Sequence, residues 1–156
     1  MSTQDNLQEA FAGESQANRK YLAFAKKAES EGFNQVAKLF RAAADAETVH
    51  AHKHLKVMDG IKSTKENLEE AIEGETHEYT KMYPQMILEA EKEGGKEKAL
   101  QSFDFANKVE SIHASLYQKA LDNMDSSESV DYYVCQVCGN TVENNAPDKC
   151  HVCGAP

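Results

Sequence analysis

A short motif that occurs twice limits what this chain can fold into. Residues 46–50 read A-E-T-V-H, and residues 109–113 read V-E-S-I-H. A Gly-Glu-Ser/Thr triplet precedes each copy, and its glutamate lies at a similar separation in the two halves: 33 residues from Glu14 to Glu47, and 35 residues from Glu75 to Glu110. Repeated carboxylates and imidazoles at helical spacing predict a symmetric site for two metal ions.

The residues around these motifs recur at the spacing of one helix face. Apolar residues and glutamates alternate at steps of three and four, which is the period of an α-helix. Gly32, Gly60 and the pair Gly94-Gly95 are predicted helix ends. Ser63-x-x-Glu66 has the form of a capping box and should open a third helix, in which Pro84 is a candidate kink. We therefore expect an all-α fold with four helices.

Four glutamates fall on these apolar stripes, where leucine or alanine would be expected: Glu14, Glu47, Glu75 and Glu110. Unpaired buried carboxylates are costly, so four converging ones require a cation. His50 and His113 each follow a glutamate by three residues, close to one helical turn. A glutamate from each of two helices, with a Glu-x-x-His from each of the other two, is the ligand set of carboxylate-bridged di-iron and di-manganese bundles.

The two halves differ at one position. Three residues after Glu14 the chain has Ala17, whereas three residues after Glu75 it has Glu78, a seventh candidate ligand. A ferric ion should prefer the carboxylate of Glu78, and a ferrous ion the imidazole of His50. We hypothesise that one metal ion exchanges these two ligands when its oxidation state changes. The alternative is that Glu78 is an ordinary exposed helix acid.

Two tyrosines, Tyr21 and Tyr83, lie about two turns beyond Glu14 and Glu75. Two interpretations stay open for them. Each is either an ordinary core residue or a hydrogen-bond donor to a ligand carboxylate.

All four cysteines lie within the last 22 residues, as Cys135-x-x-Cys138 and Cys150-x-x-Cys153. Two residues between cysteines is the spacing of a metal knuckle, in which both thiolates face one cation. Clustered cysteines in a chain without an export signal favour a metal over disulfides. A tetrahedral four-sulfur site accepts iron or zinc, and a zinc ribbon that only holds the tail together is the alternative interpretation.

Composition divides the chain into three segments and excludes some functions. We expect a helical bundle over 1–124, an acidic, serine-rich linker at 125–131 and a metal-binding domain at 132–156. A net charge of -9 without clustered lysine and arginine argues against nucleic-acid binding. No apolar run is long enough for a membrane span. With no export signal at its start, the chain is expected to be cytoplasmic.

The motifs together resemble those of the rubrerythrins: F-A-G-E-S at 11–15, A-E-x-V-H at 46–50, E-G-E-T-x-E at 73–78 with M-Y-P at 82–84, V-E-x-I-H at 109–113, and the paired C-x-x-C tail. The resemblance spans nearly the whole chain. It implies a ferritin-like di-iron four-helix bundle followed by a rubredoxin-like domain whose four cysteines hold one iron.

By position, the resemblance implies which residues bind each iron of the pair. One iron would be held by Glu14, Glu47, Glu78 and Glu110, with His50 as a ligand in the reduced state. The other would be held by Glu47, Glu75, Glu110 and His113. The bridging carboxylates would then be Glu47 and Glu110.

The resemblance also implies an activity, namely reduction of hydrogen peroxide to water in protection against oxidative stress. Electrons would come from NAD(P)H through its reductase and rubredoxin or a similar donor, and the iron of the four-cysteine site would relay them. His50 and Glu78 would be the catalytic residues. Two other classes stay open: a ferroxidase or iron-handling protein that uses O₂, and a non-catalytic module stabilised by zinc.

The link between the second and third helices bears on oligomeric state. Residues 59–64 reach at most ~20 Å, whereas a second helix of about 25 residues is ~38 Å long. The link is therefore too short for the long crossover of a ferritin-like bundle. Either the bundle runs up-down-up-down, or two chains exchange helix pairs. With the resemblance, we favour a helix-swapped homodimer.

Overall fold

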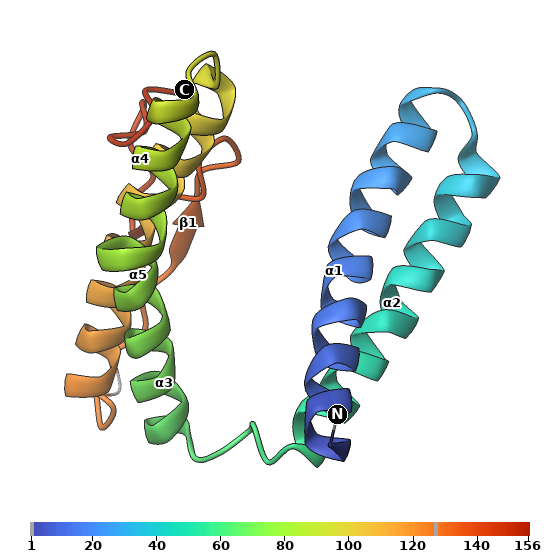
Figure 1. The fold of residues 1–156 in the computed structure, drawn as a ribbon. Helices are drawn as coiled ribbons and strands as arrows, with labels where there is room; N and C mark the ends of the chain where they lie inside the picture. Colours follow the sequence, from blue (N-terminus) through green and yellow to red (C-terminus); the bar gives the residue numbers. More distant parts are fainter. Residues whose placement is uncertain (1, 127) are drawn as a thin grey trace. The chain divides into compact units, whose positions relative to one another are not determined.

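The computed structural model describes residues 2–126 and 128–156, and most of these residues are helical (Figure 1). The elements are, in chain order, α1 (Thr3–Ser30), α2 (Asn34–Val57), α3 (Thr64–His77), the π-helix η1 (Glu78–Met82), α4 (Tyr83–Glu93), α5 (Glu97–Asp122), β1 (Tyr132–Val134) and β2 (Thr141–Glu143). The predicted all-α class is confirmed. The chain divides into two compact units, one ending at Lys62 and the other beginning at Ser63.

The first unit is a hairpin of α1 and α2, and a glycine turn closes it. Gly32 has a φ of 83°, in the left-handed region that a side chain disfavours. Its N–H donates to the carbonyl of Glu29 at 3.0 Å, and the N–H of Phe33 donates to the carbonyl of Ala28 at 2.8 Å. These two hydrogen bonds form a Schellman motif, so α1 ends close to the predicted stop and α2 can turn back along it.

Small residues make up the buried apolar core of this hairpin: Ala25, Ala28, Ala37, Ala44 and Ala51. Their short side chains allow the two helices to approach closely. Several large apolar side chains are exposed on the hairpin instead: Phe24, Phe33, Val36, Leu39, Val49 and Val57. A two-helix unit is too small to bury such side chains by itself, so this surface is suited to contact with further helices.

The second unit begins with the predicted capping box. The hydroxyl of Ser63 accepts from the N–H of Glu66 at 3.3 Å, and the Glu66 carboxylate accepts from the N–H of Ser63 at 3.1 Å. Helix α3 then continues through η1 into α4. Pro84, the candidate kink, lies in the first turn of α4, and the segment upstream of α4, η1, is π-helical. Because a proline lacks an N–H, it cannot supply the regular hydrogen bond to the carbonyl four residues earlier.

The C-terminal part of this unit is a small antiparallel ribbon. Strands β1 and β2 pair with Tyr132 opposite Glu143 and Val134 opposite Thr141. We call residues 132–156 the four-cysteine ribbon. The described part of the predicted linker, residues 125–126 and 128–131, contains neither helix nor strand, and residue 127 lies outside the described residues. No helix among the described residues is long and apolar enough to cross a membrane.

Candidate metal centres

Three predicted ligands converge in the first unit and form what we call the first half-site: Glu14 on α1, with Glu47 and His50 on α2. Their donor atoms all lie within 4.8 Å of one another. The Nδ1 atom of His50 is 3.0 Å from a Glu47 carboxylate oxygen and 3.9 Å from one of Glu14. The Glu47 side chain is only 17% exposed, whereas that of His50 is 55% exposed.

A buried asparagine fixes the two helices at this level. Asn18 lies one helical turn after Glu14, and its amide donates to the carbonyl of Ala44 at 2.7 Å and to the hydroxyl of Thr48 at 2.8 Å. The Thr48 hydroxyl itself donates to the Ala44 carbonyl at 3.1 Å. Because both N–H donors of a buried amide are satisfied across the helix pair, this network holds α1 in register with α2.

Three more predicted ligands converge in the second unit and form the second half-site: Glu75 on α3, with Glu110 and His113 on α5. The Nδ1 atom of His113 is 3.0 Å from a Glu110 carboxylate oxygen and 3.6 Å from one of Glu75. The side chains of Glu110 and His113 are 16% and 27% exposed. The two copies of Glu-x-x-His therefore give nearly the same local arrangement.

The carboxylates of each half-site perturb one another. Burial, and then the hydrogen bond with Glu110, raises the pKa of Glu75 to about 8. In the first half-site the hydrogen bond with Glu47, followed by burial, raises the pKa of Glu14, and the same hydrogen bond lowers the pKa of Glu47. Neighbouring acids that resist joint ionisation are a favourable place for a cation, which can replace the shared proton.

The remaining predicted residues of the bundle lie close to these acids or in an aromatic cluster. Glu78 is the first residue of η1, and burial followed by the charge of Glu110 raises its pKa. Burial and then the charge of Glu78 likewise raise the pKa of Tyr83. Tyr21 contacts the rings of Phe24 and Phe40. The ligand role of Glu78 and the hydrogen-bonding roles of both tyrosines stay predictions.

The second half-site contacts the four-cysteine ribbon through a residue that sequence reasoning missed. The Nε2 atom of His113 lies 3.0 Å from the hydroxyl oxygen of Thr141 on β2. The carboxylate of Glu143 also pairs with Lys119 of α5. The sequence contains no signal for Thr141, which is 28 residues from its partner. Asn18 was also missed, although an amide on an apolar stripe is a recognisable signal.

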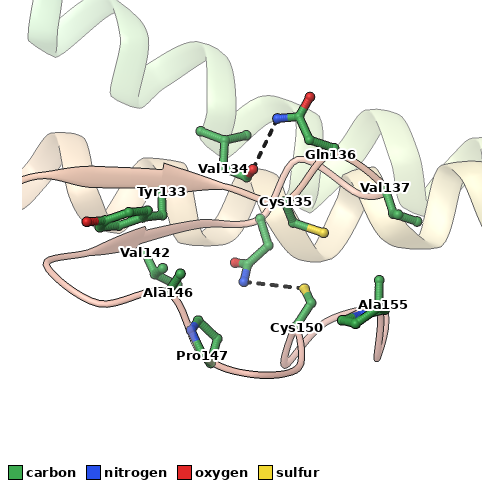
Figure 2. A pocket seen from close by; sticks show the side chains of 12 residues that line it. Tyr133, Val134, Cys135, Gln136, Val137, Val142, Ala146, Pro147, Cys150 and Ala155 are labelled. Carbon is green, nitrogen blue, oxygen red and sulfur yellow. Dashed lines mark hydrogen bonds between the residues drawn. The ribbon is translucent and has the colours of Figure 1, made fainter.

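An apolar hollow of about 330 Å³ opens in the ribbon beside two of the cysteines. Figure 2 shows Cys135 and Cys150 on its wall together with Val142 and Pro147. The side-chain amide of Asn140, which is buried, lies 3.6 Å from the sulfur of Cys150. Apolar side chains and the side-chain N–H donor of Asn140 thus lie beside these sulfur atoms, and such surroundings tune the potential of a metal bound to sulfur.

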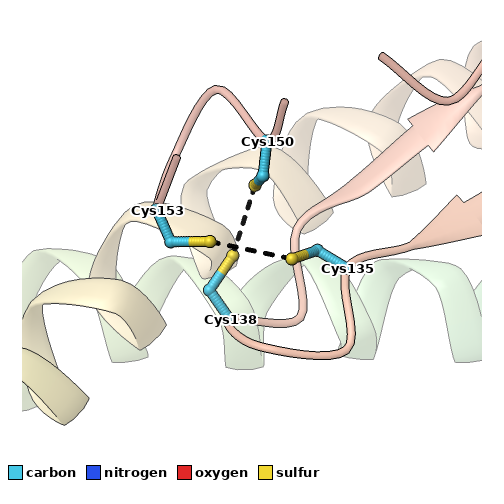
Figure 3. Close-up of side chains that lie close together, drawn as sticks. All are labelled: Cys135, Cys138, Cys150 and Cys153. Carbon is cyan, nitrogen blue, oxygen red and sulfur yellow. Dashed lines mark hydrogen bonds between the residues drawn. The ribbon is translucent and has the colours of Figure 1, made fainter. Parts of the chain in front are cut away.

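All four predicted cysteines point toward one another (Figure 3). The sulfur atoms of Cys135 and Cys153 are 3.7 Å apart, and those of Cys138 and Cys150 are 3.5 Å apart. Such a cluster of four thiols is the donor set of a tetrahedral iron or zinc site.

The first cysteine of each knuckle is the more acidic. Backbone N–H groups two and three residues further along donate to its sulfur, which lowers the pKa of Cys135 and lowers that of Cys150 to about 6. Burial raises the pKa of the Cys138 thiol to about 12. Four thiolates so close together repel one another unless a cation is bound between them. The two knuckles place their sulfur atoms where they can bind such a cation.

The donor sets define the class. Carboxylate and imidazole groups from a repeated Glu-x-x-His pattern suit a pair of iron ions, and four sulfur atoms on two knuckles suit a single iron. A helical protein with both sets is a di-iron carboxylate protein with an attached four-cysteine metal ribbon.

Comparison with known proteins places the chain more closely. The sequence model of the rubrerythrin family matches residues 5–121. Rubrerythrin-2 of Clostridium acetobutylicum is 32% identical over 97% of this chain and 91% of its own length. Nigerythrin of Nitratidesulfovibrio vulgaris is 34% identical over 99% of this chain and 83% of its own length. A solved structure of nigerythrin in a mixed-valence state covers all of this chain and 84% of its own, with a TM-score of 0.58. The chain belongs to the rubrerythrin family.

Family membership confirms the predicted cofactors. Rubrerythrins contain a di-iron carboxylate site and a four-cysteine iron site, and this chain groups the corresponding glutamates, histidines and cysteines. Rubrerythrins are peroxide-reducing enzymes associated with oxidative stress. The assignment of individual residues to individual irons stays a prediction.

Proposed function

We propose that this protein reduces hydrogen peroxide to water at a di-iron site, with electrons relayed through an iron in the four-cysteine ribbon. The observation that carries the proposal is the contact between the second half-site and this ribbon, made by His113 and Thr141. A protein that only stored or oxidised iron would not need a one-electron centre beside its oxidation site. This contact therefore favours a reductase over a ferroxidase.

The chemistry needs two electrons and two protons for each peroxide. When bound, the iron pair supplies both electrons, one from each ferrous ion as it becomes ferric, so that hydrogen peroxide and two protons yield two waters. The four thiolates of the ribbon would hold an iron, which would supply one-electron redox chemistry to return these electrons. Zinc could not serve there, since it has no accessible redox change.

The residues of the chain hold and orient this centre. In the proposal Glu47 and Glu110 would each serve both irons, while Glu14 and Glu75 would each serve one. A tyrosine phenol is protonated at neutral pH, and burial raises the pKa of Tyr83 further, so the phenol is proposed to donate a hydrogen bond to a nearby carboxylate. The physiological donor is proposed to be rubredoxin or a similar carrier, reduced by an NAD(P)H-dependent reductase.

His50 and Glu78 are proposed to exchange as ligands of one iron. Two observations support the exchange: the His50 side chain is more than half exposed, and Glu78 opens a π-helical segment, where the backbone departs from regular helical bonding. Crystals of the reduced and oxidised protein test the idea. His50 should bind in the reduced state and Glu78 in the oxidised state, and identical ligands in both states would refute the exchange.

Each half-site presents only three donors, so the proposed di-iron site needs both of them. We propose that they come from different chains of a helix-swapped homodimer. Two observations support this proposal. The α1–α2 hairpin leaves large apolar side chains exposed, and helices of a partner chain would bury them. The link between α2 and α3 spans only residues 58–63, which is too short for a long crossover.

A complementation experiment tests the swap. A Glu47→Ala chain and a Glu110→Ala chain, each unable to complete a site alone, are co-expressed. In a swapped heterodimer one site combines the two intact half-sites, so about half of the bundle iron should return. In an unswapped dimer every site keeps one defect, and no recovery would contradict the swap. The two variants expressed separately are the controls.

Anaerobic stopped-flow absorbance tests the activity. The iron-loaded, dithionite-reduced protein is mixed with one equivalent of peroxide, and separately with dissolved O₂. We expect peroxide to oxidise both the iron pair and the sulfur-ligated iron rapidly, and O₂ to react much more slowly. Fast O₂ consumption without preference for peroxide would favour the ferroxidase. Metal analysis that found only zinc would favour the non-catalytic module.

A further inference from the structure

Thr141 makes two hydrogen bonds that bear on the orientation of His113. Its hydroxyl donates to the carbonyl of Gly139 at 3.2 Å, so the hydroxyl oxygen is left as an acceptor for the Nε2–H of His113 at 3.0 Å. With its proton on Nε2, the neutral imidazole has a free lone pair on Nδ1. That nitrogen faces Glu110 and Glu75, which is where a metal ion would bind.

We propose that Thr141 is a positioning residue for the di-iron site, acting on His113 from the four-cysteine ribbon. It selects the tautomer and holds the ring orientation in which Nδ1 is a metal ligand. This inference rests on the proposed function. It assigns a residue of the four-cysteine ribbon a role in orienting a ligand of the iron pair.

The same contacts join the two metal centres. Gly139 follows Cys138 directly, so covalent bonds and two hydrogen bonds connect a cysteine sulfur to the imidazole of His113 by way of the Thr141 hydroxyl. With both sites loaded, the iron held by the four cysteines would supply electrons one at a time to the iron pair, and the Thr141 hydroxyl would lie on the connection between them. The Thr141 hydroxyl links the backbone carbonyl of Gly139 to the imidazole of His113.

The ribbon is held against α5 in a way that keeps Thr141 in place. Thr141 and Glu143 are two residues apart on β2, so their side chains share one face of the strand. Glu143 pairs with Lys119, one and a half helical turns beyond His113. Gly139 also lies near α5, since a Cβ at that position would come within 3.9 Å of Val109. Two polar contacts and one close approach therefore set the position of the hydroxyl.

The first half-site has no such support. His50 has the same Nδ1 contact with a glutamate three residues earlier. Within residues 2–126 and 128–156, however, no hydrogen bond to its Nε2 atom is found. The hydroxyl thus distinguishes a fixed histidine from one that can leave its metal ion.

Three variants test the role of the hydroxyl. Thr141→Val removes it at nearly constant shape, Thr141→Ser keeps it, and Lys119→Ala weakens the contact of the ribbon without touching His113. The first readout is the affinity of the bundle for Fe²⁺ in anaerobic titrations. Loss of a group that orients a ligand histidine should weaken it about 10- to 100-fold in Thr141→Val. Thr141→Ser should stay close to the original protein.

The second readout is the rate at which the sulfur-ligated iron is oxidised after one equivalent of peroxide, followed by its own absorbance. Thr141→Val should slow this step about 10-fold or more, with recovery in Thr141→Ser. Unchanged affinity in Thr141→Val would overturn the inference. So would equal losses in the valine and serine variants. A larger loss in Lys119→Ala than in Thr141→Val would also overturn it, since the contact of the ribbon and not the hydroxyl would then support the site.

The two readouts separate this inference from the proposed function. If the iron-loaded original protein did not reduce peroxide, the proposed function would fail. A selective loss of Fe²⁺ affinity in Thr141→Val would still establish Thr141 as the support of His113.

Discussion

The two half-sites contain the same donors but hold their histidines differently. In each, Nδ1 of the histidine lies 3.0 Å from the glutamate three residues earlier. The Nε2 atom of His113 also contacts the hydroxyl of Thr141. The His113 side chain is half as exposed as that of His50, at 27% against 55%. If both histidines bind metal as proposed, the repeated motif would provide one histidine with a support behind its ring and one without it.

The helix carrying the additional acid differs as well. α1 is a regular helix throughout, whereas α3 passes into η1 at Glu78. The half with the firmly held histidine therefore also supplies the extra carboxylate. In the proposed exchange, the duplication would provide the site and the differences between the copies would provide its redox response. The following predictions test this comparison, beginning with the largest expected effect.

The largest effect should come from the two bridging positions, where the halves are expected to behave alike. Glu47→Ala and Glu110→Ala should each lose both bundle irons and keep the sulfur-ligated iron, so that iron falls from about three to about one per chain. Metal analysis of the purified variants measures this. If one variant kept both bundle irons, the proposed equivalence of the halves would be wrong.

The histidines should show where the halves differ. His113→Ala should weaken iron binding by at least about 100-fold in both oxidation states, because a fixed ligand is lost. His50→Ala should weaken binding only in the ferrous state, since Glu78 can serve the ferric ion. Anaerobic Fe²⁺ titration and iron retention after oxidation measure the two states. Equal losses in both variants would contradict the asymmetry.

Asn18 offers a test of how the first half is held together. Asn18→Ala leaves the carbonyl of Ala44 and the hydroxyl of Thr48 without their amide donor, and it should cost about 1–3 kcal/mol of unfolding free energy. Tyr79 occupies the equivalent register position, four residues after Glu75, so Tyr79→Phe is a matched control that should stay within about 0.5 kcal/mol. Urea unfolding measures both changes. A neutral Asn18→Ala would show that the network does not stabilise the hairpin.

The smallest effect concerns pH and the metal-free protein. Glu75 has a pKa of about 8 when folded, against 4.5 as its ordinary value, so the folded chain keeps a proton that the unfolded chain has lost between these values. Stability from this group should therefore fall as pH rises from about 4.5 to about 8 and level off above. The fall should be modest, because solvent screens a partly exposed carboxyl.

Thermal unfolding at several pH values, with metal removed, measures that slope. Glu75→Gln should flatten it, since the amide does not titrate. Glu14→Gln should flatten it less, because the hydrogen bond that raises the pKa of Glu14 lowers the pKa of Glu47, so the two contributions oppose each other. An unchanged slope in Glu75→Gln would assign the pH dependence to other groups.

Much of the site could be predicted because its parts are local. One helical turn brings Glu47 to His50, and Glu110 to His113, whatever surrounds them. The glutamates of the neighbouring helices could be added because an acid on an apolar stripe needs a partner. The knuckles of the four-cysteine ribbon follow from spacing in the same way.

Other features depend on contacts between distant residues and could not be predicted. The π-helical form of the segment at Glu78 is one, since the sequence only indicated an irregularity near Pro84. The bonding of Asn18 is another, because its register with Ala44 is set by the packing of two helices.

The sequence by itself indicated which side chains are candidate metal ligands and which helix or knuckle carries each of them, because these relations extend over three or four residues. Only the tertiary structure decided how the two histidines differ. Thr141 reaches His113 because the four-cysteine ribbon folds back on α5, and that contact joins residues 28 apart. The hydrophobic periodicity of a helix carries no information about such a contact, because residues from a distant part of the chain set the orientation of the histidine ring.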